Sequence, residues 1–201
     1  MSMNENIGFD IDGVFSNFTK AFTQIANKKY GTHILETCDE ALSWNFEDYY
    51  PITKQNVKEI INDLQKEEHK RFWEDLELLP NIDKNILDSL AHHNISFITS
   101  RNPENEYTNI KTQTSRWLKR VLGVKNPDVT VAHEKGPVAA EKGLHWFVDD
   151  KWENCRDVKA YHPECKVYLV HKPHNQHVDI AGVIRINSVH DFVEAIHEYH
   201  K

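Results

Sequence analysis

The sequence predicts an α/β protein: a three-layer, Rossmann-like parallel sheet with a small helical cap inserted after the first strand. An apolar run at residues 7–11 ends in acidic residues and glycine, as a buried strand does where it opens onto a loop. Residues 18–80 show no strong strand pattern and are rich in aromatic and charged side chains. After Pro80, apolar runs alternate with amphipathic segments, which is typical of βαβ units and a parallel sheet. We therefore expect a core formed by residues 1–17 and 81–201, and a cap formed by residues 18–80.

Two segments before Pro80 have apolar side chains at helical spacing. The first apolar face consists of Phe18, Ala21, Phe22, Ile25 and Ala26, and the second of Val57, Ile60, Ile61 and Leu64. We expect one helix directly after the first strand and another inside the cap.

After Pro80 the expected helices and strands alternate, and right-handed crossovers would place the sheet between two helical layers. Gly123 is placed to end one helix, and Ser188 with Asp191 resembles a capping box that opens the last one. In such sheets the active site lies beyond the carboxyl ends of the strands. The expected helices lie at residues 86–91 and 110–121, around Val138, near Trp152 and at 189–196; the expected strands lie at 95–99, 129–131, 144–148, 166–170 and, at an edge, 184–186.

The composition is that of a globular protein of modest size. A length of 201 residues suits one large domain or one domain with a small insertion. The formal net charge of -7 argues against a broad nucleic-acid surface, which needs basic side chains to neutralise phosphates. A small phosphorylated ligand is still compatible with this net charge, because a bound metal ion and a nearby cationic side chain can make the site positive even though the protein as a whole is negative.

The three cysteines, Cys38, Cys155 and Cys165, are odd in number and widely spaced. We therefore expect neither a disulfide framework nor a Cys-x-x-Cys zinc site. The N-terminus lacks a positive flank before a long apolar run, and no stretch approaches the ~20 apolar residues that span a membrane. We expect a cytoplasmic protein without a membrane partner, acting alone or as a homodimer.

Two pairs of acidic residues follow expected strands. Asp10 and Asp12 stand at the end of the first strand, where period-two spacing would point both side chains the same way if the strand continued. Asp149 and Asp150 follow the strand at 144–148. Four carboxylates at the ends of parallel strands repel one another, and a hard divalent cation such as Mg²⁺ is the natural compensation. The alternatives are a solvated acidic turn and two separate helix N-cap regions.

Polar residues also end the neighbouring strands. Thr99, Ser100 and Arg101 come together, and a hydroxyl there could hold a phosphate oxygen or, at Ser100, cap a helix. Lys135 precedes a short helix, where it could offset the charge of the acids and of a phosphate instead of being an ordinary surface lysine. Lys142 is a second candidate, but it lies at the far end of that helix, roughly 10 Å away. We expect Lys135 to be the cation of the site.

The order DIDGV, FITSR, Lys135, FVDD resembles the four motifs of the haloacid dehalogenase (HAD) superfamily over residues 7–170. More narrowly, DIDGVFSNF resembles the opening motif of the 5'(3')-deoxyribonucleotidases, phosphatases that act on nucleoside monophosphates. The resemblance implies an α/β fold, a Mg²⁺ cofactor and a role for each motif residue. These roles are the nucleophile for Asp10, the general acid and base for Asp12, phosphoryl binding for Thr99, the motif-three cation for Lys135, and metal binding for Asp149 and Asp150 together with Asp10 and the backbone carbonyl of Asp12.

The resemblance also implies a base-stacking aromatic eight residues after the nucleophile, a position that Phe18 occupies. His133 stands where these relatives usually have an arginine, two residues before the lysine, and Lys135 lies further from the acid pair than in them. The aromatic residues of the cap, Trp73 included, are either core or a platform for a base. The candidate substrate-binding residues are Phe18, Trp44, Phe46, Ser100, Arg101 and His133.

The expected activity is that of a magnesium-dependent phosphomonoesterase that forms an aspartyl-phosphate on Asp10 and acts on (deoxy)nucleoside monophosphates, with no nucleic-acid partner. The alternatives are a phosphatase for another small metabolite, for a nucleic-acid 3' phosphate, or a non-catalytic, receiver-like regulatory protein. Receiver domains have a different motif order and lack a large insertion after the first strand. His171, His174 and His177 do not match a zinc pattern, so we expect them to be solvated.

Overall fold

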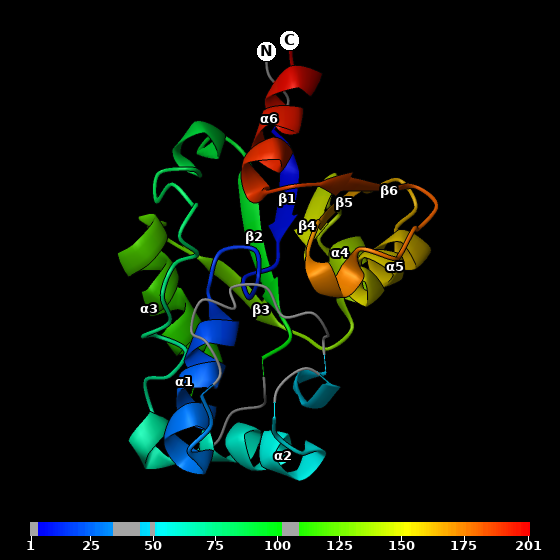
Figure 1. The fold of residues 1–201 in the computed structure, drawn as a ribbon. Coiled ribbons are helices and arrows are strands. Elements are labelled where there is room, and N and C mark those ends of the chain that lie inside the picture. The colour runs from blue at the N-terminus through cyan, green and yellow to red at the C-terminus, as the bar shows by residue number, and fades with distance from the viewer. Residues whose placement is uncertain (1–3, 34–44, 49–50, 102–108) are drawn as a thin grey trace.

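The computed structural model describes residues 4–33, 45–48, 51–101 and 109–201. Its six strands are all parallel and form one sheet in the order β3-β2-β1-β4-β5-β6 (Figure 1). The strands are β1 (Asn6–Phe9), β2 (Asn94–Thr99), β3 (Asp128–Val131), β4 (Trp146–Asp149), β5 (Lys166–Val170) and β6 (Val183–Ile186). The helices are α1 (Phe18–Tyr30), α2 (Lys54–Asp63), α3 (Ile110–Leu122), α4 (Lys135–Glu141), α5 (Trp152–Tyr161) and α6 (Val189–Tyr199). Short 3-10 helices are η1 (Phe46–Asp48), η2 (Glu67–His69), η3 (Asp88–Leu90) and η4 (Pro173–Asn175).

The two faces of the sheet pack against different helices. On one face Phe9 of β1 packs in a cluster with Trp117 of α3 and Phe192 of α6. On the other face Phe147 of β4 packs with α4 and α5, through Ala139 and other small apolar side chains. Because successive residues of a strand point to opposite faces, strands covered on both sides are almost continuously apolar. The predicted Rossmann-like α/β fold, with a parallel sheet between two helical layers, is confirmed.

Strand β1 lies at the centre of the sheet, between β2 and β4. The strand order reverses here, since β2 and β3 lie on one side of β1 and β4 to β6 on the other, which leaves a crevice at the carboxyl ends. Phe9 pairs with Val148 of β4, so the residues that follow β1 and β4 are neighbours at this edge. Helices α1 and α2 lie beyond the ends toward which the strands run, at the bottom of Figure 1.

The chain between β1 and β2 forms α1, α2 and three of the 3-10 helices. Phe22 and Ala26 of α1 pack with Ile60 of α2 in a small apolar cluster of their own. The side chains of Asn17 and Thr53 accept backbone N–H groups and cap the two helices. Both helices expected in this part of the chain are therefore present.

The prediction of a helix at residues 86–91 is wrong. The segment forms successive 3-10 turns, and only Asp88–Leu90 is a regular 3-10 helix. The side chain of Asp83 accepts the backbone N–H of Asn85 at 2.9 Å. Such local bonds from aspartate and asparagine compete with helical hydrogen bonding, which the apolar spacing alone does not reveal.

Two predicted helix ends have different outcomes. Gly123 ends α3 in the left-handed conformation, with its N–H donating to the carbonyl oxygen of Leu118, as expected. Ser188 precedes α6, but its hydroxyl does not cap a backbone N–H; it donates to Oδ1 of Asp191 at 3.3 Å. Asp191 instead accepts the N–H of Asn187 at 2.8 Å, so the predicted capping box does not form and only a bond of this one kind is present.

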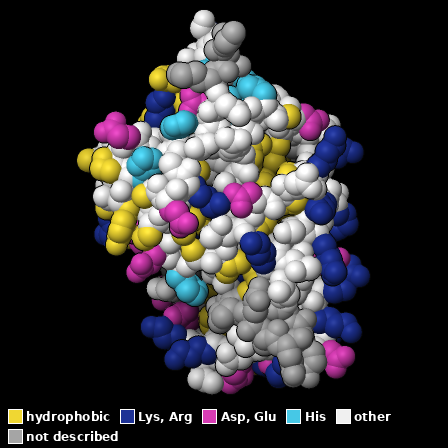
Figure 2. Space-filling view, turned by 180° about the vertical axis from the view of Figure 1, so that it is seen from behind, with side chains coloured by type: hydrophobic (Ala, Val, Ile, Leu, Met, Phe, Trp, Pro, Cys, Tyr) yellow, Lys and Arg dark blue, Asp and Glu magenta, His cyan; other side chains and the backbone are white. Residues whose placement is uncertain are grey.

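The surface carries charges of both signs. Figure 2 shows lysine and arginine side chains gathered along one edge of the molecule, where α3 lies. Helix α3 contributes exposed Lys111, Arg116, Lys119 and Arg120. Arg116 faces Glu74 at 3.5 Å, so this basic edge is partly neutralised within the chain. Among the helices of the described residues, none has both the length and the apolar character to cross a membrane.

Candidate active site

The site begins where β1 ends, at the centre of the carboxyl edge of the sheet. The strand stops at Phe9, two residues earlier than predicted, and the N–H of Asp10 donates to the carbonyl oxygen of Val148 at 2.9 Å. The chain then turns at Gly13, whose φ of +82° lies in the left-handed region. A Cβ atom at Gly13 would lie 2.1 Å from Oδ2 of Asp150, so the turn requires glycine.

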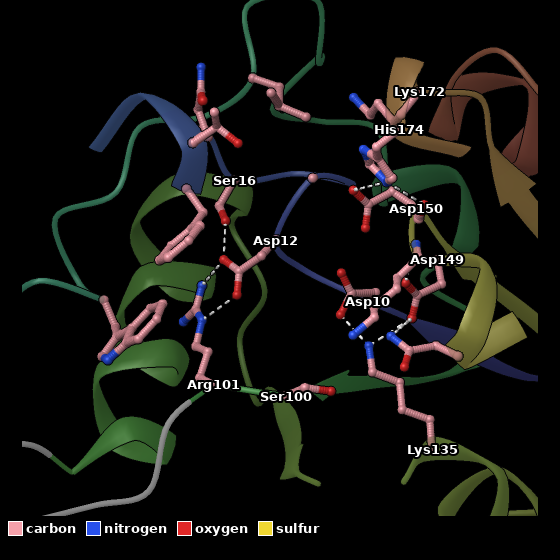
Figure 3. Close-up of a pocket in the computed structure, with 18 of the residues that line it drawn as sticks. Asp10, Asp12, Ser16, Ser100, Arg101, Lys135, Asp149, Asp150, Lys172 and His174 are labelled. Atoms are coloured by element: carbon pink, nitrogen blue, oxygen red, sulfur yellow. Dashed lines mark hydrogen bonds and ion pairs between the residues drawn. The ribbon is translucent and has the colours of Figure 1, made fainter. Parts of the chain in front are cut away.

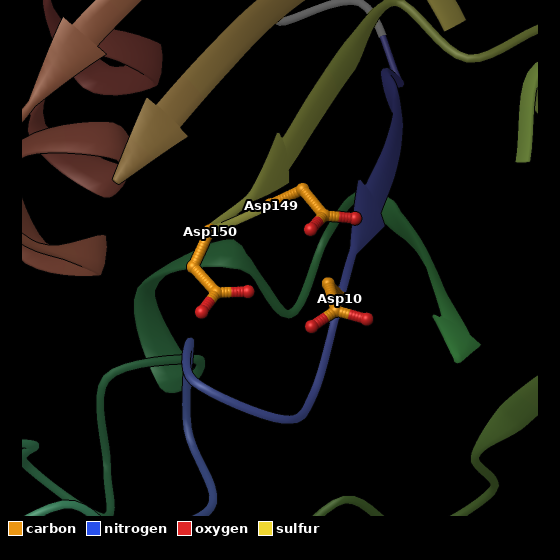
Figure 4. Close-up of side chains that lie close together, drawn as sticks. All are labelled: Asp10, Asp149 and Asp150. Atoms are coloured by element: carbon orange, nitrogen blue, oxygen red, sulfur yellow. The ribbon is translucent and has the colours of Figure 1, made fainter. Parts of the chain in front are cut away.

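Asp10, Asp149 and Asp150 bring their carboxylates together at this edge (Figures 3 and 4). One oxygen from each lies within 4.8 Å of the others, and all three residues are buried. Asp149 ends β4 and Asp150 follows it, so the pairing of β1 with β4 is what brings the three together. Three clustered carboxylates repel one another and need positive charge beside them.

Lys135 supplies one positive charge. It is the first residue of α4, and its fully buried side chain donates from Nζ to Oδ1 of Asp10 and to Oδ2 of Asp149, the latter at 2.7 Å. Asp149 also accepts the N–H of Lys151 at 2.8 Å and Nδ2 of Asn154 at 3.0 Å. The carboxylate of Asp149 is thus held by protein donors, and Lys135 bridges it to Asp10.

The acids carry more negative charge than Lys135 balances. Burial raises the pKa of Asp10 to about 8; Lys135 opposes this rise, and Asp149 and Asp12 add to it. Burial also raises the pKa of Asp150 well above its ordinary value, with further contributions from Asp149 and Asp10. Burial alone would lower the pKa of Lys135, but the carboxylates of Asp10 and Asp149 raise it. The protein by itself therefore does not stabilise all three acids in their ionised form.

A divalent cation fits this group of carboxylates. Oδ1 of Asp150 is buried and has no hydrogen-bond partner among the described residues. A buried carboxylate oxygen without a partner is costly unless a cation or a donor faces it. A donor set made only of carboxylate oxygens suits a hard cation such as Mg²⁺ better than a softer metal.

Asp12 faces Arg101 instead of the other acids (Figure 3). Arg101 donates from Nη2 to Oδ1 and from Nε to Oδ2, both at 2.9 Å, and Ser16 donates to Oδ1 at 2.6 Å. Burial raises the pKa of Asp12, but Arg101 and Ser16 outweigh it and hold the pKa below its ordinary value. The strand ends at Phe9, so the condition under which Asp10 and Asp12 would point the same way is not met. The part of its backbone carbonyl in metal binding stays a prediction.

The three residues at the end of β2 and directly after it differ in their exposure to the site. Thr99 is fully buried, and its hydroxyl lies 3.4 Å from Oδ2 of Asp12 rather than in the cavity beside the acids. Ser100 lines that cavity. The guanidinium of Arg101 is buried and is bound to Asp12 and, at 2.7 Å, to the hydroxyl of Thr114. Of the three, Ser100 and Arg101 line the cavity, and a role for either in binding a phosphate oxygen stays a prediction.

A cavity of about 510 Å³ opens beside the acids, a size that suits a small-molecule ligand. Its lining combines the three carboxylates, Lys135, Ser100 and His133 with the apolar side chains of Phe18, Phe46, Ile61 and Trp73. The rings of Phe18 and Trp73 lie 5.6 Å apart and nearly parallel, at 9°. The predicted residues Phe18, Phe46 and His133 are thus at the cavity, whereas Trp44 lies outside the described residues.

Several residues of the cavity wall were not predicted from the sequence. Lys172 and His174 follow β5, in the histidine-rich string that we expected to be solvated. That expectation is wrong for His174, whose side chain is 6% exposed and whose Nε2 lies 3.1 Å from the carbonyl oxygen of Asp150. The available signal was position, because this loop also follows the carboxyl end of a central strand. Ser16, Asn17, Lys151 and Asn154 also line the cavity without having been predicted.

Comparisons with known proteins agree with this geometry. The family model described as 5' nucleotidase, deoxy (pyrimidine), cytosolic type C protein matches residues 4–198. No curated protein matches the sequence. A candidate phosphoglycolate phosphatase from Lactobacillus plantarum superposes with a TM-score of 0.61 at 16% identity, covering 96% of this chain and 99% of that chain. A candidate haloacid dehalogenase-like hydrolase from Burkholderia xenovorans gives a TM-score of 0.57 at 13% identity, covering 98% and 99%.

A candidate β-phosphoglucomutase from Thermotoga maritima is similar to the same extent, with a TM-score of 0.53 at 16% identity and coverage of 96% and 99%. At these identities the structural likeness shows the fold alone, and the family follows from the model that matches almost the whole chain. The central sheet, the acids at the ends of β1 and β4, and Lys135 at the start of α4 are arranged as the motif order implies. The chain therefore belongs to the family of 5' nucleotidase, deoxy (pyrimidine), cytosolic type C proteins, which are phosphatases, and it has the fold of the HAD-like hydrolases on which it superposes.

Proposed function

We propose that this phosphatase is a magnesium-dependent phosphomonoesterase for nucleoside monophosphates, deoxy forms above all. One observation carries the proposal: a buried group of three carboxylates and Lys135 lines the same cavity as a set of aromatic side chains. The acidic part suits a metal and a phosphate, and the aromatic part suits a nucleobase. The family description points to the same substrate class.

In the proposed reaction Asp10 attacks the phosphorus atom and forms an aspartyl-phosphate, while the bond to the leaving oxygen breaks. Bound Mg²⁺, held by Asp10 and Asp150, would offset the negative charge that keeps a phosphate dianion away from a carboxylate. Lys135, whose Nζ donates to Oδ1 of Asp10, contributes to the same end. Asp12 gives a proton to the leaving oxygen and later takes one from the water that hydrolyses the intermediate. Because Arg101 holds Asp12 as a carboxylate here, this role requires the Asp12 side chain to leave Arg101, take up a proton from water and turn toward the substrate before it can donate that proton.

The test is a phosphate-release screen across nucleoside monophosphates, sugar phosphates and 3'-phosphorylated oligonucleotides, with Mg²⁺ or with excess chelator. We expect deoxynucleoside monophosphates to be the best substrates. Chelation should lower turnover by about 10³-fold or more, because a metal of this kind supplies several kcal/mol of charge stabilisation. Full turnover in chelator would contradict the metal dependence, and a preference for sugar phosphates would contradict the substrate class.

The stacking of the base can be tested at Phe18, which lines the cavity and lies parallel to Trp73. We expect Phe18→Ala to lower kcat/KM for a nucleotide by about 5- to 150-fold, since losing a base-stacking aromatic costs roughly 1–3 kcal/mol. The control is glycerol phosphate, which has no base and should be hydrolysed equally well by both proteins. Equal losses on both substrates would mean that Phe18 supports the fold of the site and not the base.

A further inference from the structure

The loop that follows β5, residues 171–178, holds a polar group that the proposed reaction does not use. Asn175 lies in this loop, at the end of η4, and is fully buried. Its Nδ2 donates to the carbonyl oxygen of Asp150 at 2.8 Å and to that of Val170 at 2.9 Å. The amide thus links the end of β5 to the residue that follows β4.

The other side of the same amide is also occupied. Oδ1 of Asn175 accepts the backbone N–H of Lys172 at 3.1 Å and Nη1 of Arg185 at 2.7 Å. A primary amide has two N–H donors and an oxygen that accepts two bonds, so this side chain is fully satisfied. A swapped amide would face two carbonyl oxygens with its own oxygen and two donors with its NH₂ group. The four partners therefore fix the orientation of the Asn175 amide. One of them, Arg185, is an exposed residue of β6.

The backbone carbonyl of Asp150 accepts hydrogen bonds, whereas one of its carboxylate oxygens has no hydrogen-bond partner among the described residues. Its carbonyl oxygen receives Nδ2 of Asn175 and lies 3.1 Å from Nε2 of His174. Its Oδ2 lies where a Cβ atom at Gly13 would be only 2.1 Å away, so little space remains around it. Its Oδ1 is buried without a hydrogen-bond partner among the described residues. A metal ligand is expected to have this arrangement: hydrogen bonds to its backbone fix its position, and its carboxylate oxygen remains available to a cation.

We propose that Asn175 is a positioning residue for the metal site: it fixes the backbone of Asp150 so that the carboxylate meets Mg²⁺. The inference rests on the proposed function, because it presupposes that Asp150 binds Mg²⁺. Arg185 supports it indirectly by fixing the amide of Asn175. Partners of this kind orient ligands in metal sites, and losing one weakens metal affinity or activity by about 10- to 100-fold.

The experiment compares Asn175→Ala with Asn6→Ala by titrating each full-length protein with Mg²⁺ in a calorimeter. Asn6 is a matched control at the opposite end of the sheet, since its Nδ2 also donates to two backbone carbonyl oxygens, those of Lys142 at 3.2 Å and Gly143 at 3.1 Å. We expect Asn175→Ala to raise the Kd for Mg²⁺ by about 10- to 100-fold, and Asn6→Ala to leave it unchanged. At saturating Mg²⁺, kcat of Asn175→Ala should return close to the wild-type value.

Arg185→Ala is the second variant, because the Arg185 residue is exposed and the fold should tolerate its loss. We expect a smaller rise in the Kd for Mg²⁺, and this variant decides the matter if Asn175→Ala does not fold. An unchanged Kd for Mg²⁺ in a folded Asn175→Ala protein would overturn the inference. If Asn175→Ala does not fold, an unchanged Kd in Arg185→Ala would overturn it. A wild-type protein that binds no Mg²⁺ would instead overturn the proposed function, so the two failures are distinct.

Discussion

Asp10→Asn is expected to lower kcat by roughly 10⁴- to 10⁶-fold, the scale on which a covalent enzyme suffers from losing its nucleophile. The amide of asparagine cannot form the aspartyl-phosphate, and the other described carboxylates of the cavity are committed elsewhere, Asp150 to the proposed Mg²⁺ and the other two to protein donors. Asp149 is bound by Lys135, Lys151 and Asn154, and Asp12 by Arg101 and Ser16. Turnover of a nucleoside monophosphate at saturating Mg²⁺ is the measurement.

The same substitution should not unfold the protein. The pKa of Asp10 rises from its ordinary value of 3.8 to about 8, chiefly through burial. A folded-state pKa above the unfolded one means that ionised Asp10 opposes folding, so stability is lost as the pH rises from the lower value toward the higher. Asparagine stays neutral over this range. In metal-free buffer at neutral pH, Asp10→Asn should therefore melt at the same temperature as the wild type or higher.

The matched control for this prediction is Asp128→Asn. Asp128 also pairs with a lysine of the α4 segment, Lys142 at 2.6 Å, and accepts the hydroxyl of Ser96 at 2.7 Å, but it lies outside the cavity. Its loss should leave kcat unchanged. Near wild-type turnover by a folded Asp10→Asn protein would rule out Asp10 as the nucleophile.

The fold was predictable because the inner strands are short, largely apolar runs that end in polar or turn-forming residues. Strand β5 was placed at its exact bounds, and β2 within one residue, since burial on both faces leaves little ambiguity in such runs. The segment at 86–91 was mistaken for a helix because its apolar spacing is helical while Asp83 and Asn85 favour local turns. The spacing of apolar residues indicates which side chains are buried, but it does not indicate which backbone hydrogen bonds form.

The site was predictable as far as strand ends determine it. Asp10 follows β1, Asp149 ends β4 and Lys135 lies after β3, so the topology alone brings them to one edge. The orientation of Asp12 was not predictable, because it depends on a strand that ends two residues early and on a buried Arg101. The roles of His174 and Asn175 likewise depend on contacts across the sheet edge that no spacing in the sequence encodes.

Lys135→Ala should lower turnover by about 10²- to 10³-fold at saturating Mg²⁺, the scale on which one preorganised charge donor contributes to a transition state. Its Nζ is bound to both Asp10 and Asp149, and its side chain is fully buried. Removing it leaves two buried carboxylates without their cation, which in other buried ion pairs costs about 3–5 kcal/mol of stability. Saturating Mg²⁺ should restore part of this loss, so melting temperatures are measured with and without the metal.

Lys142→Ala is the control that separates this role from a general effect of losing a lysine near α4. Lys142 lies at the other end of the helix, where its Nζ pairs with Asp128 at 2.6 Å and its side chain is 24% exposed. Since this pair lies outside the cavity, the substitution should leave both turnover and the response to Mg²⁺ close to wild type. Of these two lysines, Lys135 is the one whose side chain contacts the acids. A loss of turnover in Lys142→Ala alone, or an equal loss in both variants, would mean that Lys135 is not the motif-three cation.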